Sequence, residues 1–333
     1  MTLIGITMGC PVGIGPEIIL RFFAVLPPDP PCRPVVLGDA GVLRRTAGLL
    51  DIPVQVSEWR PGSEPAPGTM PVYSLSSLPA EELQWGRPDR TTGRAMAAYI
   101  EQGAALAMAG ELAALVTGPI SKKALHQAGF AYPGHTEMLA ALTGAKQHLM
   151  MMAGSRLRVT LATIHEPLVR VPSLLTRETV EQCIRLTADS LKTDFALESP
   201  RIAVAALNPH AGEEGMFGLE EEEIIRPAVE ACAGAGEVSG PWPPDTVFHR
   251  AAEGGFDAVV AMYHDQGLIP FKLLHFKDGV NVTLGLPIVR TSVDHGTAYD
   301  IAGRGVADSE SLAEAFALAA RIAYNRSDPG RQI

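Results

Sequence analysis

The 333-residue sequence contains no apolar stretch long enough to cross a bilayer, and no basic segment precedes the apolar run at its amino terminus. A membrane-spanning helix needs roughly 18 or more consecutive apolar residues, and a secretion signal needs a basic leading segment. Neither a membrane span nor a secretion signal is expected. We therefore expect a cytoplasmic protein without a membrane partner.

Cysteine is scarce and runs of basic residues are missing. The four cysteines, Cys10, Cys32, Cys183 and Cys232, lack CxxC spacing, which argues against a disulfide framework and against a thiolate zinc cluster. The net charge of −10 argues against a nucleic-acid partner. The net charge does not argue against an anionic metabolite as ligand, because a few cationic side chains that converge in a cleft override the charge of the whole chain.

The sequence contains the alternation of strand-like and helix-like segments that is typical of an α/β fold. Its length is sufficient for about two domains. Short apolar runs alternate with segments of helical period, which is typical of a parallel sheet wrapped by helices. The last helix is expected to begin with a capping box, Ser311 to Glu314. Strands are expected at 3–7, 35–37, 113–117, 159–163, 202–207 and 258–262, and helices at 92–109, 176–191 and 311–324.

Polar segments follow five of the expected strands. They are MGCPVGIGPEI after Thr7, TGPIS from Thr117, IHE from Ile164, NPHAGE from Asn208 and YHDQG from Tyr263. Ligands of open α/β sheets bind outside the carboxyl ends of the strands. These segments therefore predict a ligand site.

Three histidines, His165, His210 and His264, stand in equivalent places after three of these strands. A hydrogen-bonded structural histidine is the ordinary interpretation of any one of them. Together they favour a divalent metal, because neutral imidazoles from several strands can hold an ion and leave positions open for substrate.

Other residues suggest an anion site. His135 and Thr136 lie in a glycine turn before an expected helix, where free N–H groups and the helix dipole favour phosphate. Lys272 and Arg290 lie in mostly apolar segments, where a cation needs an anion beside it. Asn281 lies between them in the sequence.

The first glycine segment fails as a Rossmann fingerprint. Reading from Gly13 gives Gly13 and Gly15, and then Ile18 where the third glycine belongs. A second glycine-rich segment, DHGTAYDIAGRGVADSES from Asp294, leads into the last helix and is the other candidate for a nucleotide site.

With these segments assembled, the sequence resembles the 4-hydroxythreonine-4-phosphate dehydrogenase family of vitamin B6 synthesis over nearly its whole length. The segments that carry the resemblance are GIGPE, TGPISK, GHTE, NPHAGE, PPDTVF, AMYHDQG and GVNVTLGLPIVRTSVDHGTA. More distantly, GIGPE and HGTAYDIAGRG resemble the isocitrate and isopropylmalate dehydrogenases. The resemblance implies two α/β/α domains with a cleft between them: a nucleotide-binding domain of residues 1–120 plus 285–333, and a substrate, metal and dimerisation domain of residues 121–284.

The resemblance also implies ligands and partners. It implies NAD or NADP, one divalent metal (Zn, Mg or Co), and a homodimer with a shared active site in which the partner chain supplies the residue matching His264. It assigns the metal to His165, His210 and His264, and the substrate to His135, Thr136, Lys272, Asn281 and Arg290. The expected cofactor contacts are Gly13, Gly15, His295, Gly296, Thr297, Ala298 and Asp308.

The implied reaction is metal-dependent oxidation of 4-phosphohydroxy-L-threonine to 2-amino-3-oxo-4-phosphooxybutanoate, which decarboxylates to 3-amino-2-oxopropyl phosphate. Asp245 is the preferred general base, and Asp265, beside His264, is either a base or a partner of a ligand histidine. One alternative is a 4-phospho-D-threonate or D-erythronate dehydrogenase of the same family. Another is a metal-dependent phosphate-ester hydrolase, which leaves HGTAYDIAGRG without a role.

The sequence departs from the family in its first glycine segment, where the family usually has aspartate and alanine in place of Cys10 and Val12. Two interpretations remain open. Either the departure changes substrate choice or the placement of the nicotinamide, or the loop tolerates the change.

Overall fold

The computed structural model describes residues 2–27 and 30–327, which form two compact units. Unit 1 comprises the described residues up to 147 together with 286–323. Unit 2 comprises 148–285 together with the described residues from 324 onward. Each unit contains six of the described strands.

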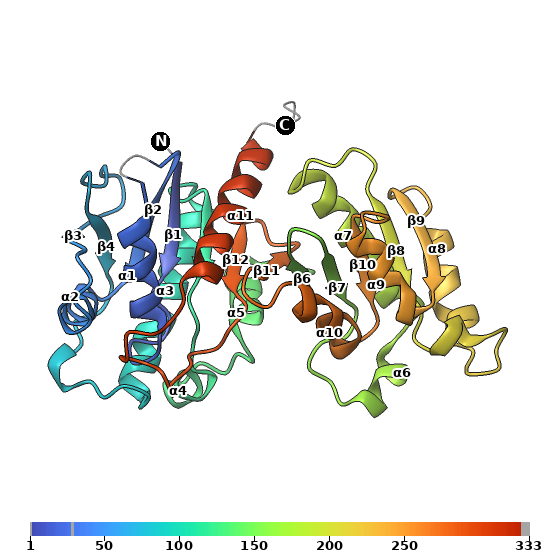
Figure 1. Cartoon of the computed structure of the whole chain (residues 1–333), viewed down its shortest axis with the longest axis horizontal. Helices are drawn as coiled ribbons and strands as arrows, with labels where there is room; N and C mark the ends of the chain where they lie inside the picture. Colours follow the sequence, from blue (N-terminus) through green and yellow to red (C-terminus); the bar gives the residue numbers. More distant parts are fainter. Residues whose placement is uncertain (1, 28–29, 328–333) are drawn as a thin grey trace. The chain divides into compact units, whose positions relative to one another are not determined.

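Unit 1 contains a wholly parallel sheet (Figure 1). Val35, Val36 and Leu37 are all fully buried although neighbouring side chains of a strand point to opposite faces. Helices therefore cover both faces, as is usual for parallel sheets. The strand order is β3 (Val56–Glu58), β4 (Met70–Ser74), β2 (Cys32–Gly38), β1 (Thr2–Thr7), β5 (Ala114–Thr117) and β12 (Arg290–Val293).

The helices of unit 1 divide between the two faces of this sheet. Helix α3 packs with α4 and α5, and their apolar residues share a core cluster with Val35, Leu37 and Leu115. Helix α11 lies over β12, where Thr291 donates a hydrogen bond to the Ala315 carbonyl. The helices are α1 (Gly15–Val25), α2 (Ala40–Leu49), η1 (Ala80–Glu82), α3 (Arg90–Met108), α4 (Lys122–Gln127), α5 (His135–Thr143) and α11 (Glu310–Ser327), the last of which ends in unit 2.

Unit 2 contains a mixed sheet, in which β6 runs antiparallel to both of its neighbours. The other neighbouring pairs are parallel. The strand order is β11 (Val280–Leu284), β6 (Leu149–Ala153), β7 (Arg158–Leu161), β10 (Ala258–Ala261), β8 (Arg201–Ala205) and β9 (Glu237–Trp242) (Figure 1).

Helices also cover both faces of the unit 2 sheet. Helices α9 and α10 share a core cluster with Val159 and Leu161, whereas Thr160, which points to the opposite face, bonds Thr187 of α7. The helical segments are η2 (Leu168–Arg170), α6 (Val171–Leu174), α7 (Arg177–Thr193), η3 (Pro209–Gly212), the π-helical η4 (Glu221–Ile225), α8 (Arg226–Ala231), α9 (Pro244–Ala252) and α10 (His264–Leu274).

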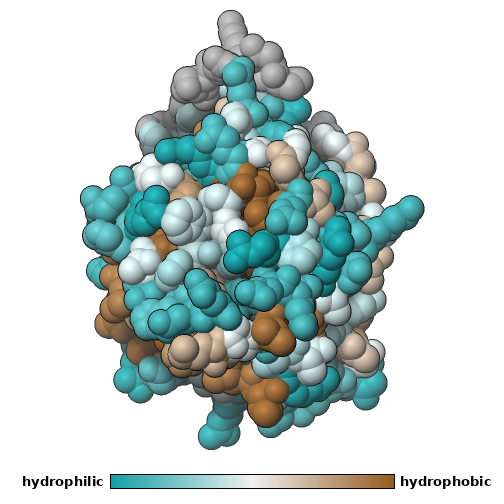
Figure 2. Space-filling view, turned by 90° about the vertical axis from the view of Figure 1, so that its right-hand side faces the viewer, coloured by the Kyte–Doolittle hydropathy of each residue, from teal (hydrophilic) through white to brown (hydrophobic). Residues whose placement is uncertain are grey.

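Figure 2 views the side of the molecule on which β9 and α8 lie in Figure 1, and this side is mostly hydrophilic with small scattered apolar patches. Such patches are ordinary for a protein surface. Among the described residues, no helix combines the length and the apolar character that a membrane span requires.

The structure confirms the α/β fold class and places strands and helices at all of the expected segments. Two expectations are wrong. The sheet of unit 2 is not wholly parallel, because the Met-rich β6 enters it antiparallel. The last helix begins at Glu310, so Ser311 lies inside it and accepts a hydrogen bond from the Asp294 N–H instead of forming a capping box.

The division between the units also differs from the expected boundary at residue 120. Helices α4 and α5 pack against α3, so unit 1 extends to residue 147. His135 and Thr136 consequently belong to unit 1 together with Arg290, and not to the domain that carries the three histidines.

Gly15 tests the packing at the start of α1. A Cβ at this position would overlap the Met8 carbonyl oxygen, whereas a Cβ at the exposed helical Gly48 would meet nothing within 4 Å. We expect Gly15→Ala to lower the free energy of unfolding by roughly 1–3 kcal/mol, the usual cost of overpacking. The matched control Gly48→Ala should be neutral or stabilising by up to about 1 kcal/mol. Urea unfolding of both variants checks this, and equal stabilities would contradict it.

Candidate functional site

The glycine loop after β1, residues 8–14, is anchored to two other loops of unit 1. The Cys10 N–H donates to the Pro119 carbonyl at 2.8 Å, and the Ile14 N–H donates to the Thr297 carbonyl at 3.1 Å. A Cβ on Gly13 would lie 3.0 Å from that same Thr297 oxygen. Gly13 therefore serves internal packing, and the segments after β1, β5 and β12 meet at one edge of the sheet.

Cys10 lies inside this junction and not on its surface. It is fully buried, Val12 is 1% exposed, and the Cys10 Sγ lies 3.4 Å from the Tyr299 Oη. Burial raises the pKa of the Cys10 thiol, and burial first and then Cys10 itself raise the pKa of Tyr299 to about 12. Both groups are neutral near pH 7, so Cys10 acts as a buried packing residue and not as a thiolate nucleophile.

The loop His295–Ala298 offers polar atoms that the protein itself leaves unused. The His295 Nδ1 bonds the Gly296 carbonyl at 3.0 Å, which fixes the proton on Nδ1 and makes Nε2 an acceptor. The His295 Nε2 is buried without a hydrogen-bond partner, and a Cβ on Gly296 would meet only open space. This loop therefore fits a ligand with a hydrogen-bond donor, such as a dinucleotide.

Asp308, another expected cofactor contact, has a structural role. Its Oδ1 accepts the Glu310 N–H at 2.9 Å and so contributes to the start of α11.

Helix α5 presents a candidate anion site in unit 1. Its N-cap, Gly134, offers no side-chain cap, so the first backbone N–H groups of the helix are available to a ligand. The His135 Nε2 is buried there without a hydrogen-bond partner. Arg290 is 3% exposed, and its Nε and Nη2 donate to the Thr117 hydroxyl at 3.1 and 2.7 Å.

The charges around His135 favour an anion. Burial first, and then the positive charges of Arg290 and Lys122, hold the pKa of His135 well below its ordinary value of 6.5, so the ring is neutral. Burial lowers the pKa of Arg290 to about 10, against the opposing effect of Glu137. An anion would relieve the cost of both buried groups. The sequence interpretation missed Lys122, although it stands in the quoted segment TGPISK.

In unit 2, the three candidate metal histidines follow β7, β8 and β10, which are neighbours in the sheet. The rings of His165 and His264 lie with their centroids 5.7 Å apart. The His264 Nδ1 bonds the Asp265 Oδ1 at 2.7 Å. This contact has the geometry of a carboxylate that orients a histidine ring, which is the second of the two roles expected of Asp265.

The described part of the chain holds no ready-made metal site. Among residues 2–27 and 30–327, no three His, Cys, Asp or Glu side chains gather closely enough to hold an ion. The chemistry of the donors nevertheless fits a divalent metal such as Zn, because imidazole nitrogens are common ligands of this ion.

His210 begins an unusual run of backbone. Residues His210, Ala211, Gly212, Glu213, Glu214 and Gly215 have φ values of 54°, 57°, 80°, 43°, 56° and 85°. Left-handed backbone costs roughly 1–2 kcal/mol for each residue other than glycine and rarely extends beyond a single position. Strain of this kind persists only where the surroundings impose it, and it clusters at functional sites.

The remaining candidates of unit 2 occupy separate elements. Asp245 is exposed in the first turn of α9, and α9 packs against Pro209–Gly212, the segment that carries His210. Lys272 is half-buried in the last turn of α10, and Asn281 is half-buried on β11.

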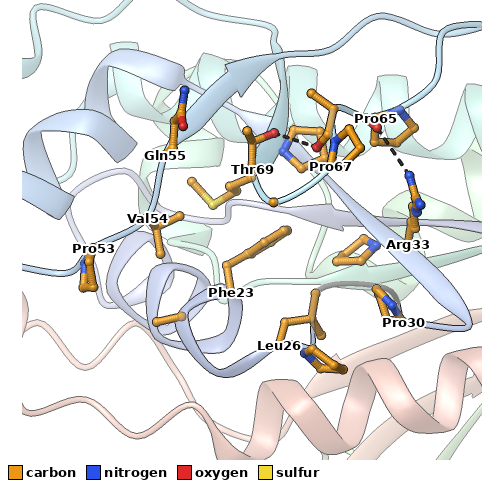
Figure 3. A pocket seen from close by; sticks show the side chains of 17 residues that line it. Phe23, Leu26, Pro30, Arg33, Pro53, Val54, Gln55, Pro65, Pro67 and Thr69 are labelled. Carbon is orange, nitrogen blue, oxygen red and sulfur yellow. Dashed lines mark hydrogen bonds between the residues drawn. The ribbon is translucent and has the colours of Figure 1, made fainter.

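A cavity of about 260 Å³ lies elsewhere in unit 1. Figure 3 shows Phe23, Leu26 and Val54 beside several prolines, with Arg33 bonded to the Pro65 carbonyl at the rim. None of the candidate site residues lines this cavity.

Comparison with known proteins identifies the family. Residues 30–319 match the family described as "Pyridoxal phosphate biosynthetic protein PdxA". The chain belongs to the PdxA family. This finding confirms the resemblance that the sequence motifs indicated.

Individual relatives of the PdxA family agree over nearly the full length. A protein of Desulfosudis oleivorans named 4-hydroxythreonine-4-phosphate dehydrogenase is 55% identical over 322 residues, 95% of each chain. The crystal structure of the Klebsiella pneumoniae enzyme of that name has a TM-score of 0.89 and 45% identity, covering 97% of this chain and 98% of that one. A D-threonate 4-phosphate dehydrogenase of Cupriavidus necator is 44% identical, and the match covers 98% of this chain and 99% of that one. All three are named dehydrogenases, which makes this chain an oxidoreductase.

Because His135 is neutral in the folded protein, we expect it to make the free energy of unfolding sensitive to acid. Because its pKa is lowered in the folded state, the unfolded chain binds the extra proton below pH 6.5 and stability is lost as the pH falls. Relative to His135→Gln, the wild type should lose about 2 kcal/mol of unfolding free energy between pH 7.5 and pH 5. Urea unfolding at both pH values measures this, with the exposed His126→Gln as control. A pH-independent difference between wild type and His135→Gln would contradict the buried, neutral state.

Proposed function

We propose that the protein oxidises 4-phosphohydroxy-L-threonine with NAD or NADP and a divalent metal. The substrate gives a hydride to the dinucleotide and a proton to a base, which yields 2-amino-3-oxo-4-phosphooxybutanoate. This β-keto acid loses CO₂ to give 3-amino-2-oxopropyl phosphate. The single observation that supports the proposal best is the buried cationic surroundings of His135, which suit a phosphate group.

The residues of unit 1 would bind the substrate phosphate and the dinucleotide. Arg290 supplies the charge and keeps its orientation through Thr117. The neutral His135 and the first N–H groups of α5 supply directional hydrogen bonds, with Thr136 beside them. Binding energy from a phosphate that does not react can orient the carbinol that does. The buried His295 Nε2 would accept a hydrogen bond from the dinucleotide.

The residues of unit 2 would hold the metal and further parts of the substrate. His165, His210 and His264 are the proposed metal ligands, and Asp265 fixes the His264 ring so that its Nε2 is presented. When bound, the metal would supply Lewis acidity toward the substrate hydroxyl, and the dinucleotide would supply the hydride acceptor. Lys272 and Asn281 are proposed substrate contacts. Asp245, whose helix packs beside the His210 segment, is the proposed proton acceptor.

A homodimer with a shared site is part of the proposal. The exposed side of α10 and the segment that follows it carry Ile269, Leu273 and Phe276, which are 61%, 82% and 79% exposed. Large apolar side chains at such exposure favour burial by a partner. His264 begins the same helix, so a partner that covers α10 would lie close to a proposed metal ligand.

The second candidate is a 4-phospho-D-threonate or D-erythronate dehydrogenase, and the Cupriavidus necator relative supports it. Cys10 supplies no argument for either substrate over the other, because its side chain is buried against the Tyr299 hydroxyl.

The experiment that tests the function is a panel of phosphorylated hydroxy acids with NAD or NADP and Zn, Mg or Co, followed by NADH absorbance. We expect the highest kcat/KM for 4-phosphohydroxy-L-threonine. A higher value for 4-phospho-D-threonate would select the second candidate. Release of phosphate without any NADH would contradict both and favour a hydrolase.

His210→Ala isolates the contribution of the metal. Loss of one of three ligands should abolish metal-dependent NADH formation and leave the fold intact, because the residue is exposed. His249→Ala, at an exposed histidine of α9, is the matched control and should keep wild-type turnover. Undiminished turnover in His210→Ala would remove His210 from the site.

A further inference from the structure

Glu221 is a buried carboxylate in unit 2 to which the sequence assigned no role. It is 1% exposed and begins the π-helical segment Glu221–Ile225, whereas the next two glutamates, Glu222 and Glu223, are exposed. Single π-helical turns often occur at functional sites. A buried carboxylate is costly unless hydrogen-bond donors surround it.

The donors around Glu221 all belong to the segment that leads into His210. The Glu221 Oε1 accepts the backbone N–H groups of Leu207 and Asn208, both at 2.8 Å. The Oε2 accepts the Asn208 side-chain amide at 3.0 Å. Because a carboxylate only accepts hydrogen bonds, it can receive all three at once.

The same carboxylate also packs under the left-handed run. A Cβ on Gly212 would lie 2.7 Å from the Glu221 Oε2, so the run passes close to this oxygen, and the φ of 80° at Gly212 favours glycine there. Glu221 thus contacts residues on both sides of His210 in the sequence.

Backbone hydrogen bonds within and just beyond the run give it the form of a left-handed helical turn. The Glu213 N–H donates to the His210 carbonyl at 3.4 Å, the Gly215 N–H to Gly212 at 3.0 Å, and the Met216 N–H to Glu213 at 3.2 Å. A left-handed turn of L-residues does not persist through its own bonds. Contacts from outside the run must support it, and Glu221 is a buried side chain that bonds Leu207 and Asn208 just before the run and lies beside Gly212 within it.

We propose that Glu221 is a positioning residue that imposes the left-handed run His210–Gly215 and thereby holds the His210 imidazole in place for a divalent cation. This inference rests on the proposed function, in which His210 is a metal ligand. Partners that orient metal ligands typically change metal affinity by about 10- to 100-fold when they are removed.

The test compares Glu221→Gln and Glu221→Ala with Glu222→Gln, which removes the same charge at the next, exposed position. Glutamine has nearly the shape of glutamate, but its amide would direct N–H groups at the Asn208 amide or at the backbone donors. Two properties are measured on the full-length protein: the dissociation constant for Co²⁺ or Zn²⁺ by calorimetry, and hydrogen exchange of residues 207–216 without metal.

We expect Glu221→Gln to weaken metal binding about 10- to 100-fold and to accelerate exchange in residues 207–216. Glu221→Ala should do both more strongly, and Glu222→Gln should match the wild type. If Glu221→Ala does not fold, Glu221→Gln alone decides the question.

Three outcomes would contradict the proposal, and they distinguish its failure from the failure of the proposed function. A Glu221→Gln variant with a lower melting temperature but wild-type exchange and wild-type metal affinity would overturn the positioning role. Metal affinity lost in His210→Ala but kept in Glu221→Gln would overturn this inference and leave the proposed function standing. Metal affinity unchanged in His210→Ala would overturn the metal assignment, and the positioning role with it.

Discussion

The guanidinium of Arg290 carries a positive charge at the start of β12, where it is 3% exposed. A buried cation is tolerated only where hydrogen-bond acceptors or negative charges surround it. Several residues of unit 1 provide them. Thr117 at the end of β5 accepts two of its N–H groups, and Glu137 in the first turn of α5 offsets the loss of solvation. The same cation keeps His135 neutral, together with burial and Lys122. A phosphate would complete this arrangement, because it brings the negative charge that Arg290 and the free helix N-terminus both favour.

Unit 2 meets a different constraint, the placement of imidazoles that follow separate strands. His264 needs little support, because it begins α10 and bonds Asp265. His210 begins a run of left-handed backbone, which only contacts from outside the run can maintain. In our proposal the buried Glu221 supports this backbone, through its bonds to Leu207 and Asn208 just before the run and its position beside Gly212. Arg290 in unit 1 and Glu221 in unit 2 are therefore both buried ionisable side chains close to a histidine-bearing segment.

The sequence predicted what periodicity and strand ends determine, and it missed what depends on distant contacts. The strands before the polar segments and the long helices were found because burial on both faces gives continuous apolar runs. The antiparallel β6 was missed because its direction depends on its neighbours and not on its own composition. Lys122 and Glu221 were missed because each becomes relevant only through its contact with a neighbouring loop, which carries His135 or His210, and nothing in the local pattern predicts that contact. The sequence left two interpretations of Cys10 open for the same reason, since Tyr299, which contacts it, is 289 residues away.

The central claim is that unit 1 recognises the phosphate of its substrate through Arg290 and its neighbours. Calorimetric binding of 4-phosphohydroxy-L-threonine and of its dephosphorylated form, to the wild type and to Arg290→Ala, tests this claim most directly, with the exposed Arg60→Ala as control. The account predicts that the wild type and Arg60→Ala bind the phosphorylated form at least about 100-fold more tightly, the coupling of a close, buried charge pair. Arg290→Ala should lose most of that preference. Equal affinity of the wild type for the two forms, or a preference that survives in Arg290→Ala, would contradict it.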